Sequence, residues 1–134
     1  MSSDAPTGDL MLRTLAMPAD TNPSGDIFGG WLLSQMDVGG SLLAVDHARS
    51  RVTTVAVESM KFHLPVYVGD VLCCYASLKR IGRTSITVDV QAWVLRGGAQ
   101  RDRLLVTDGV FTYVAMDKQG RPRAVQAAET GTAG

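Results

Sequence analysis

The residue whose position in this chain most needs a chemical explanation is Asp37. It lies near the middle of the segment GGWLLSQMDVGGSLLAV (29–45), in which apolar residues would cover most of the circumference of a helix. Such a helix is normally buried, and an ionised carboxylate inside a protein is unfavourable unless it has a partner. An apolar setting would also make the carboxylate a stronger base. Asp37 is therefore a candidate general base or nucleophile. The structural alternative is a carboxylate capped by Ser34, Ser41 or backbone donors.

The beginning of the same helix offers a second chemical group. The first N–H groups of a helix lack intrahelical partners and carry partial positive charge. Gly29 and Gly30 leave these groups open, so they can stabilise a carbonyl oxygen that gains negative charge, by ~3 kcal/mol per donor in acyl-transfer enzymes. Asp37 follows Gly30 by about 10 Å along the axis. The alternative is that the two glycines only allow close helix packing.

The elements that position these groups follow from residue patterns. A loop rich in Pro, Asp, Asn and Gly (18–26) leads into a helix expected at 28–47. Residues typical of half-buried strands, separated by turn signals such as Gly97-Gly98, predict the strands. The expected strands cover residues 10–17, 54–64, 70–81, 84–96 and 103–117. The fold class is therefore α+β, with a curved antiparallel sheet wrapped around one long helix.

A chain of 134 residues suits a single domain. We expect this domain to cover residues 9–125, between a flexible N-terminus (1–8) and a flexible C-terminal tail (126–134). Strand 54–64 is expected to alternate strictly between two faces. A sheet of this size has exposed edges, so we expect at least a homodimer.

Composition and local sequence exclude several classes of protein. Lys plus Arg equal Asp plus Glu at 13 each, so a nucleic-acid partner is not expected. The N-terminus lacks the pattern of a signal peptide and no apolar run is long enough to span a membrane, which predicts a cytoplasmic protein. The adjacent Cys73 and Cys74 are expected to pack rather than to pair. With only two histidines and no spaced cysteine pair, no metal site is expected.

Five segments together resemble the hot-dog fold acyl-CoA thioesterases, specifically the short YciA-type. They are LRTLAMPADTN, GDIFGGWLLSQMDVGG, RVTTVAVESMKF, PVYVGDVLCCYASL and GRTSITVDVQAWV, in the family's order within residues 12–114. The resemblance implies a hot-dog fold and hydrolysis of acyl-CoA to free CoA and a carboxylic acid. It also implies hexamers built from dimers. Coenzyme A would be part of the substrate and a product, with no separate cofactor.

The resemblance also suggests roles for individual residues. Asp37 corresponds to the family's helix carboxylate, and Asn22 to an asparagine that a neighbouring subunit places opposite it. The IFGG segment, Ile27, Phe28, Gly29 and Gly30, corresponds to the helix entrance that binds the thioester carbonyl. Taken alone, Asn22 can equally be an ordinary turn residue before a proline.

The phosphates of CoA need cations and hydroxyl donors. The segment LKRIGRTS around a glycine turn is the first candidate, and it supplies Lys79, Arg80, Arg83 and Ser85. A solvated basic hairpin is the alternative. Arg121 and Arg123 are weaker candidates for the nucleotide phosphate.

Three other functions remain open at this level. A hot-dog hydratase or dehydratase would need a site histidine, for which His63 is the candidate although we expect it to be exposed or interfacial. A non-catalytic acyl-CoA sensor would bind the thioester and leave it intact. A scaffold subunit would use Asp37 only structurally. The preferred acyl chain does not follow from the sequence.

Overall fold

The computed structural model describes residues 5–98 and 101–125. Its elements are β1 (Asp9–Leu15), the short 3-10 helix η1 (Pro18–Asp20), α1 (Gly29–Ala48), β2 (Val52–Phe62), β3 (Val71–Ile81), β4 (Ser85–Arg96) and β5 (Asp102–Ala115). The long helix and all five strands lie within two residues of their expected positions. Of the two expected flexible ends, residues 1–4 and 126–134 lie outside the described residues. Thr7, in the described part of the N-terminus, donates its N–H to Gln91 on the sheet.

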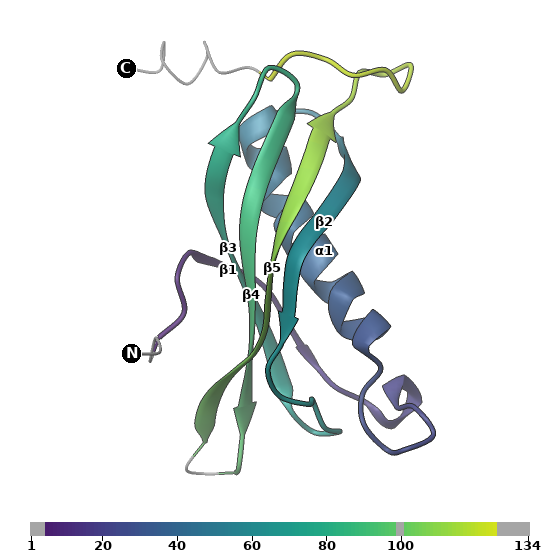
Figure 1. Ribbon diagram of the computed structural model, residues 1–134, viewed down its shortest axis with the longest axis vertical. Coiled ribbons are helices and arrows are strands. Elements are labelled where there is room, and N and C mark those ends of the chain that lie inside the picture. The colour runs from purple at the N-terminus through teal and green to yellow at the C-terminus, as the bar shows by residue number, and fades with distance from the viewer. Residues whose placement is uncertain (1–4, 99–100, 126–134) are drawn as a thin grey trace.

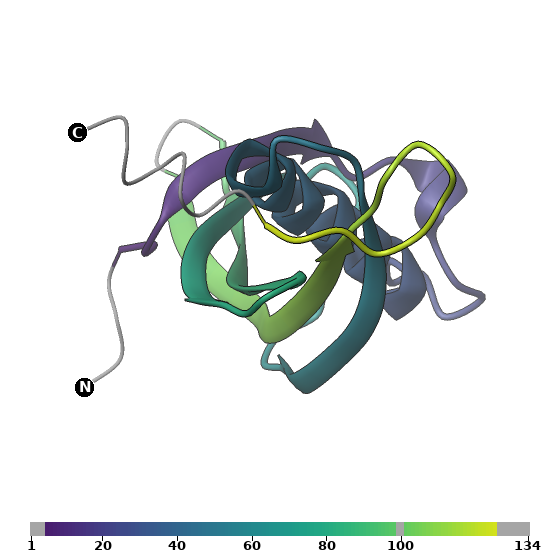
Figure 2. The same cartoon turned by 90° about the horizontal axis from the view of Figure 1, so that it is seen from above.

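The five strands form one antiparallel sheet in the order β1-β3-β4-β5-β2. The helix lies across one face of this sheet (Figure 1), and the view from above shows the sheet curling around it (Figure 2). Positive φ angles at Gly97 and Gly98 accompany the chain reversal after β4, as the glycine pair predicted. The predicted α+β fold with a curved sheet around one helix is confirmed.

Two glycines in the middle of α1 allow the helix to approach the sheet closely. A Cβ atom at Gly39 would lie 3.2 Å from Cβ of Cys74 on β3. A Cβ atom at Gly40 would lie 2.5 Å from the hydroxyl of Tyr113 on β5. At Gly30 the same test meets nothing within 4 Å. At Gly29 it would lie 3.7 Å from a ring carbon of Phe62, an ordinary contact. The close-packing glycines are therefore Gly39 and Gly40, and packing within this chain does not require a glycine at position 29 or 30.

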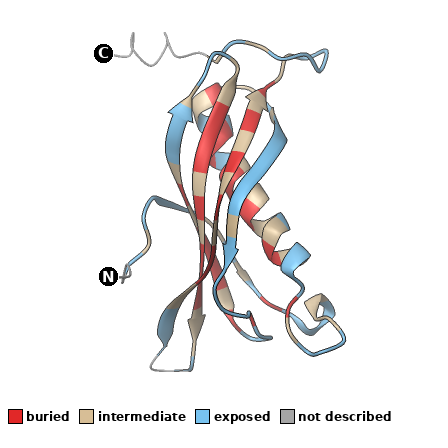
Figure 3. Ribbon diagram, viewed as in Figure 1, coloured by how far each residue is buried: buried red, intermediate tan, exposed pale blue. Residues whose placement is uncertain are grey.

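The sheet covers only part of the helix, as the burial colours show (Figure 3). Val38, Leu42 and Val45 on α1 are exposed, so the expectation of a helix buried all round is wrong for a single chain. Nearly all of β2 is exposed too, because it is an edge strand. Its expected strict alternation is also wrong, since the pairing with β5 shifts twice and Ser59 adopts a left-handed φ of 56°.

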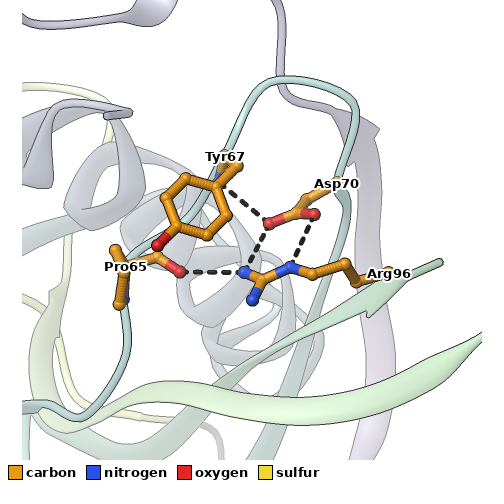
Figure 4. A network of polar contacts seen from close by, with 4 residues as sticks. All are labelled: Pro65, Tyr67, Asp70 and Arg96. Atoms are coloured by element: carbon orange, nitrogen blue, oxygen red, sulfur yellow. Dashed lines mark hydrogen bonds and ion pairs between the residues drawn. The ribbon is translucent and has the colours of Figure 1, made fainter. Parts of the chain in front are cut away.

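An ion pair with a buried carboxylate fixes the loop between β2 and β3 (Figure 4). Arg96, at the end of β4, donates to both carboxylate oxygens of Asp70 at 3.0 and 2.8 Å and to the carbonyl of Pro65 at 2.9 Å. Its guanidinium also lies 4.6 Å from the ring centre of Tyr67. Asp70 in turn accepts the N–H of Tyr67. Because the Asp70 side chain is only 4% exposed, these contacts hold the loop in one geometry.

Within the described ranges, no helix is both long and apolar enough to cross a membrane. Cys73 and Cys74 are both buried and unpaired with each other, as predicted. Burial, with a smaller contribution from Cys73, raises the pKa of the Cys74 thiol to about 12. This thiol therefore stays protonated and unreactive at neutral pH.

Candidate active site

Asp37 is held by two hydroxyl groups from the sheet. Thr54 on β2 donates from Oγ1 to Asp37 Oδ1 at 2.8 Å, and the Tyr113 hydroxyl on β5 lies 3.1 Å from the same oxygen. The Tyr113 hydroxyl also lies 2.9 Å from the Asp37 backbone carbonyl. The expected apolar setting is thus wrong on this side, because two hydroxyl groups reach the carboxylate.

The two serines that sequence offered as caps do not serve Asp37. Ser34 donates its hydroxyl to the carbonyl of Trp31, and Ser41 donates to that of Val38. Both bonds run backwards along the helix, as serine hydroxyls commonly do. The capping alternative is therefore wrong for these residues, and the donors come from strands distant in sequence.

Tyr113 is a permanent donor in this arrangement. Its side chain is fully buried, and its ring stacks on Phe111 with centroids 6.4 Å apart. Burial, followed by the neighbouring Asp37 carboxylate, raises the pKa of Tyr113 well above its usual value. The phenol therefore keeps its proton throughout the working pH range and can only support Asp37 as a neutral hydrogen-bond donor.

The helix entrance is open, as expected. The N-cap residue Phe28 makes no side-chain cap, so no side chain at that position satisfies the first N–H groups of α1. A hollow of about 260 Å³ adjoins this end of the helix, lined by Ile27, Gly29 and Leu32 together with residues 62–66. Its position beside uncapped amides suits a carbonyl that accepts their hydrogen bonds.

Backbone hydrogen bonds attach this entrance to the pinned loop. Ile27 donates its N–H to the carbonyl of Val66 at 3.0 Å, and Phe28 donates to that of Asp20 at 3.0 Å. The Ile27 side chain is buried in the core, whereas Phe28 is 50% exposed. The ion pair of Asp70 with Arg96 therefore also fixes the segment that leads into the helix.

Asn22 serves a turn in its own chain. Its Oδ1 accepts the backbone N–H of Ser24 at 2.9 Å and that of Asp26 at 3.1 Å, and its own N–H donates to the Asp26 carbonyl. The turn explanation for this residue is thus supported. These contacts occupy the side-chain oxygen of Asn22 and fix the position of its amide nitrogen, the other polar atom of the side chain.

The predicted phosphate cluster lies on the hairpin between β3 and β4. Lys79, Arg80 and Arg83 are exposed, and Lys79 pairs with Asp89 at 3.9 Å. Gly82 donates its N–H to the Ser85 carbonyl and closes the hairpin turn. The structure therefore gathers these residues at one end of the sheet and not beside Asp37.

His63 lines the hollow at the helix entrance and pairs with Asp108. Its Nε2 is 2.8 Å from a carboxylate oxygen of Asp108, and both side chains are about one-third exposed. In the part of the chain that the structure describes, no group of three or more His, Cys, Asp or Glu side chains is arranged to hold a metal ion.

Comparison with known proteins places this arrangement in a family. The model of the thioesterase superfamily matches residues 24–99. The acyl-CoA thioester hydrolase YciA of Escherichia coli is 53% identical over 124 residues, which cover 91% of this chain and 94% of that protein. The chain belongs to the YciA-type acyl-CoA thioester hydrolases.

Solved structures of this family agree with the fold. A hexameric broad-specificity acyl-coenzyme A thioesterase, solved as an aspartate-to-alanine mutant, is 51% identical with a TM-score of 0.87, covering 95% of this chain and 96% of that one. The acyl-CoA hydrolase of Staphylococcus aureus has been solved as an aspartate-to-alanine mutant, which is 29% identical with a TM-score of 0.77 and covers 85% of this chain and 69% of that one. It has also been solved as a threonine-to-alanine mutant, which is 29% identical with a TM-score of 0.76 and covers 85% of this chain and 70% of that one. The two mutated positions of that hydrolase are 17 residues apart, as are Asp37 and Thr54 here.

Sequence reasoning found Asp37 but missed Thr54 and Tyr113. Asp37 is half-buried, and a carboxylate partly removed from water requires donors. The chain has many hydroxyl side chains on its strands. Only the strand order, which sets β5 beside β2 against the helix, selects these two. No local pattern around either residue could have identified it.

Proposed function

We propose that this chain hydrolyses acyl-CoA thioesters with Asp37 as general base or nucleophile. The observation that carries this assignment is the carboxylate on α1, held at one oxygen by Thr54 and Tyr113. Two donors on Oδ1 fix the rotamer and leave Oδ2 for the reaction. The spacing shared with the two mutated positions of the Staphylococcus aureus hydrolase supports a part for Thr54 in positioning Asp37.

In the general-base route, Asp37 accepts a proton from a water molecule as the water oxygen attacks the thioester carbonyl carbon. The carbonyl oxygen becomes an oxyanion, which the amides of Gly29 and Gly30 stabilise. Collapse of the tetrahedral intermediate breaks the carbon–sulfur bond. The CoA thiolate then takes the proton that Asp37 accepted, which restores the carboxylate, and the carboxylic acid is released.

In the nucleophilic route, Asp37 itself attacks the carbonyl carbon, expels the CoA thiolate and forms an anhydride that water opens. A single turnover in ¹⁸O-water reveals the nucleophilic route if water opens the anhydride at the Asp37 carbonyl. Attack of water on the anhydride at the Asp37 carbonyl would leave label in Asp37, which mass spectrometry of its peptide detects. The general-base route puts the label only in the released acid, as does opening of the anhydride at the acyl carbonyl, so label in Asp37 is the decisive outcome.

We propose that each site is shared between two protomers. A carbonyl under direct attack lies ~3 to 3.5 Å from its nucleophile and ~3 Å from its oxyanion donors. In one chain, the helix separates Asp37 from Gly30 by about 10 Å. The amides, with Asn22, would therefore come from a partner whose helix entrance faces Asp37.

The surface of the single chain supports this pairing. Exposed apolar side chains continue from α1 onto the edge strand β2, and they include Val38, Leu42, Val45, Val55 and Val57. Exposed apolar surface and an unpaired strand edge favour association with a second copy. Because the relatives named above include a hexameric thioesterase, we propose a hexamer built from such dimers, which light scattering tests.

Subunit mixing tests the shared site. Asn22→Ala and Asp37→Asn proteins are each expected to be inactive, and exchange of their subunits is expected to restore part of the activity, since a mixed dimer contains one intact site. Absence of recovery despite exchange proven by mass spectrometry would place both residues in one chain.

We further propose that hydrolysis needs no metal or redox cofactor, that coenzyme A enters only as part of the substrate, and that the enzyme works in the cytoplasm without nucleic-acid or membrane partners. Dialysis against EDTA is expected to leave the rate unchanged. Cell fractionation tests the location.

The first experiment is thiol release from short, medium, long and aromatic acyl-CoAs by the wild type and by Asp37→Asn. We expect a loss of at least ~10²-fold in the variant, as for a lost general base. Asp9→Asn, an exposed carboxylate on β1, is the matched control. Turnover retained by a folded Asp37→Asn protein would refute the assignment, and tight binding without hydrolysis by the wild type would favour a sensor.

A further inference from the structure

The two amides proposed to stabilise the oxyanion lie at a helix end that does not fix its own direction. Gly29 and Gly30 begin α1, so their N–H groups precede the regular intrahelical bonds. The Leu32 N–H lies 3.3 Å from the Phe28 carbonyl, slightly beyond the usual range of a hydrogen bond. Glycine also restricts the backbone less than other residues do. The direction of these amides therefore depends on what holds the segment before the helix.

Two backbone hydrogen bonds hold the last residues of that segment. Ile27 donates its N–H to the carbonyl of Val66, in the loop between β2 and β3, at 3.0 Å. Phe28 donates its N–H to the carbonyl of Asp20, in η1, at 3.0 Å. The side chains of Ile27 and Val66 are both buried in the core. The helix entrance is thus attached to two separate parts of the chain.

The first attachment leads directly to Arg96 (Figure 4). The Arg96 guanidinium donates to the carbonyl of Pro65 at 2.9 Å and lies 4.6 Å from the ring centre of Tyr67. Pro65 and Tyr67 are the neighbours of Val66 in the chain. The carbonyl that accepts the Ile27 N–H therefore lies between two residues that Arg96 contacts.

The second attachment leads to the partner of Arg96, Asp70. Ala16, between β1 and η1, donates its N–H to the backbone carbonyl of Asp70 at 3.0 Å and accepts the N–H of Gly69 at 2.9 Å. The next residue, Met17, donates its N–H to Asp20 Oδ2 at 3.1 Å, and Asp20 donates its N–H to the Met17 carbonyl at 2.9 Å. The turn that presents the Asp20 carbonyl to the helix entrance is therefore tied to the same loop.

The Asp70 carboxylate joins both attachments to Arg96. Arg96 donates to Oδ1 at 3.0 Å and to Oδ2 at 2.8 Å, and Oδ2 also accepts the Tyr67 N–H at 2.9 Å. A bidentate pair fixes orientation as well as charge. Because the Asp70 side chain is only 4% exposed, water competes little for these bonds. One guanidinium therefore holds both supports of the helix entrance.

We propose that Arg96 is a positioning residue for thioester hydrolysis. Through Asp70 and Pro65 it holds the loop that fixes the helix entrance, and it thereby sets the direction of the two glycine amides. The inference rests on the proposed function and adds to it a residue of β4 that acts from outside the site. Oxyanion donors act more strongly on the transition state than on the bound substrate, so kcat depends on Arg96 more than the KM does.

Steady-state kinetics with butyryl-CoA on the assembled enzyme separate positioning from stability. The variants are Arg96→Gln and Asp70→Asn. Val94→Ala shortens a fully buried side chain on the same strand, so it is the control for loss of stability with the ion pair intact. Unfolding curves select a temperature at which every variant is folded, and light scattering checks assembly. If Arg96→Gln does not fold, Asp70→Asn takes its place under the same criteria.

We expect kcat to fall by about 10- to 100-fold in Arg96→Gln, since a misplacement of about 1 Å can cost ~10²-fold. A smaller fall is expected in Asp70→Asn, where the amide oxygen can still accept one hydrogen bond. The KM is expected to change little, and Val94→Ala is expected to keep the wild-type kcat. A wild-type kcat in folded Arg96→Gln, an equal loss in Val94→Ala, or a change confined to the KM would overturn the proposal.

The carbonyl stretch of bound substrate provides a readout that stability alone does not move. Butyryl-CoA labelled with ¹³C at the thioester carbonyl is bound to Asp37→Asn and measured by isotope-edited infrared spectroscopy. Hydrogen bonds from directed amides polarise the carbonyl and lower its frequency. We expect a lowered frequency in Asp37→Asn that returns toward the solution value when Arg96→Gln is added, but not when Val94→Ala is added.

A frequency that Arg96→Gln leaves unchanged would overturn the proposal. Two other results would instead refute the proposed function. They are a solution-like frequency in Asp37→Asn with Arg96 intact, and failure of the wild type to release thiol from butyryl-CoA.

Discussion

Replacement of Tyr113 by Phe tests how Asp37 is supported. The substitution removes only the hydroxyl that lies 2.9 Å from the Asp37 carbonyl and 3.1 Å from its Oδ1. The ring and its stacking on Phe111 remain. A hydrogen bond to a charged group contributes about 1.5 to 3 kcal/mol.

The expected loss lies at the lower end of that range. The single phenol proton is shared between two acceptors, and Thr54 still donates to Oδ1 at 2.8 Å. A loss of about 1.4 kcal/mol corresponds to a tenfold decrease in kcat. The KM is expected to change little, because Tyr113 is fully buried behind Asp37 and supports the carboxylate rather than the substrate.

Thiol release from butyryl-CoA measures this effect, with Tyr75→Phe on β3 as a matched loss of one hydroxyl. Because burial and the Asp37 carboxylate raise the pKa of Tyr113 above its usual value, the wild type keeps this donor as the pH increases. The ratio of wild-type to Tyr113→Phe activity is therefore expected to stay constant from pH 6 to 10. A ratio near one at every pH, or one that falls toward one above pH 9, would refute the role of a protonated Tyr113 at Asp37.

Three further substitutions have effects that follow from packing and hydrogen bonding. In Gly40→Ala the new methyl group would lie 2.5 Å from the Tyr113 hydroxyl. We therefore expect slower turnover and a loss of about 1 to 3 kcal/mol of unfolding free energy from overpacking. An active, fully stable variant would contradict this. Thr107 Oγ1 is buried without a hydrogen-bond partner among the described residues, so Thr107→Val is expected to be neutral or stabilising by up to about 1 kcal/mol in urea unfolding. Asp70→Asn removes a carboxylate from the contacts of Arg96 and is expected to lower the unfolding free energy by about 2 kcal/mol. This value is moderate because the Arg96 side chain is 30% exposed. Thermal unfolding that matches the wild type would show that the ion pair does not stabilise the fold.

The sequence alone determined the elements of this fold and their order. The apolar helix around Asp37, the glycine turns and the strand-forming segments are local patterns, and local patterns report secondary structure directly. The family also followed from sequence, because five ordered segments together are far more specific than a single motif. A carboxylate among apolar helix residues indicated chemistry before any geometry was available.

Only the tertiary structure decided what surrounds that carboxylate. Thr54 and Tyr113 meet Asp37 because β2 and β5 are neighbours at one side of the sheet, and pairing between strands that are about 50 residues apart has no local signal. The tertiary structure also decided which glycines pack against the sheet. Gly39 and Gly40 face side chains of β3 and β5, whereas Gly30 at the helix entrance does not.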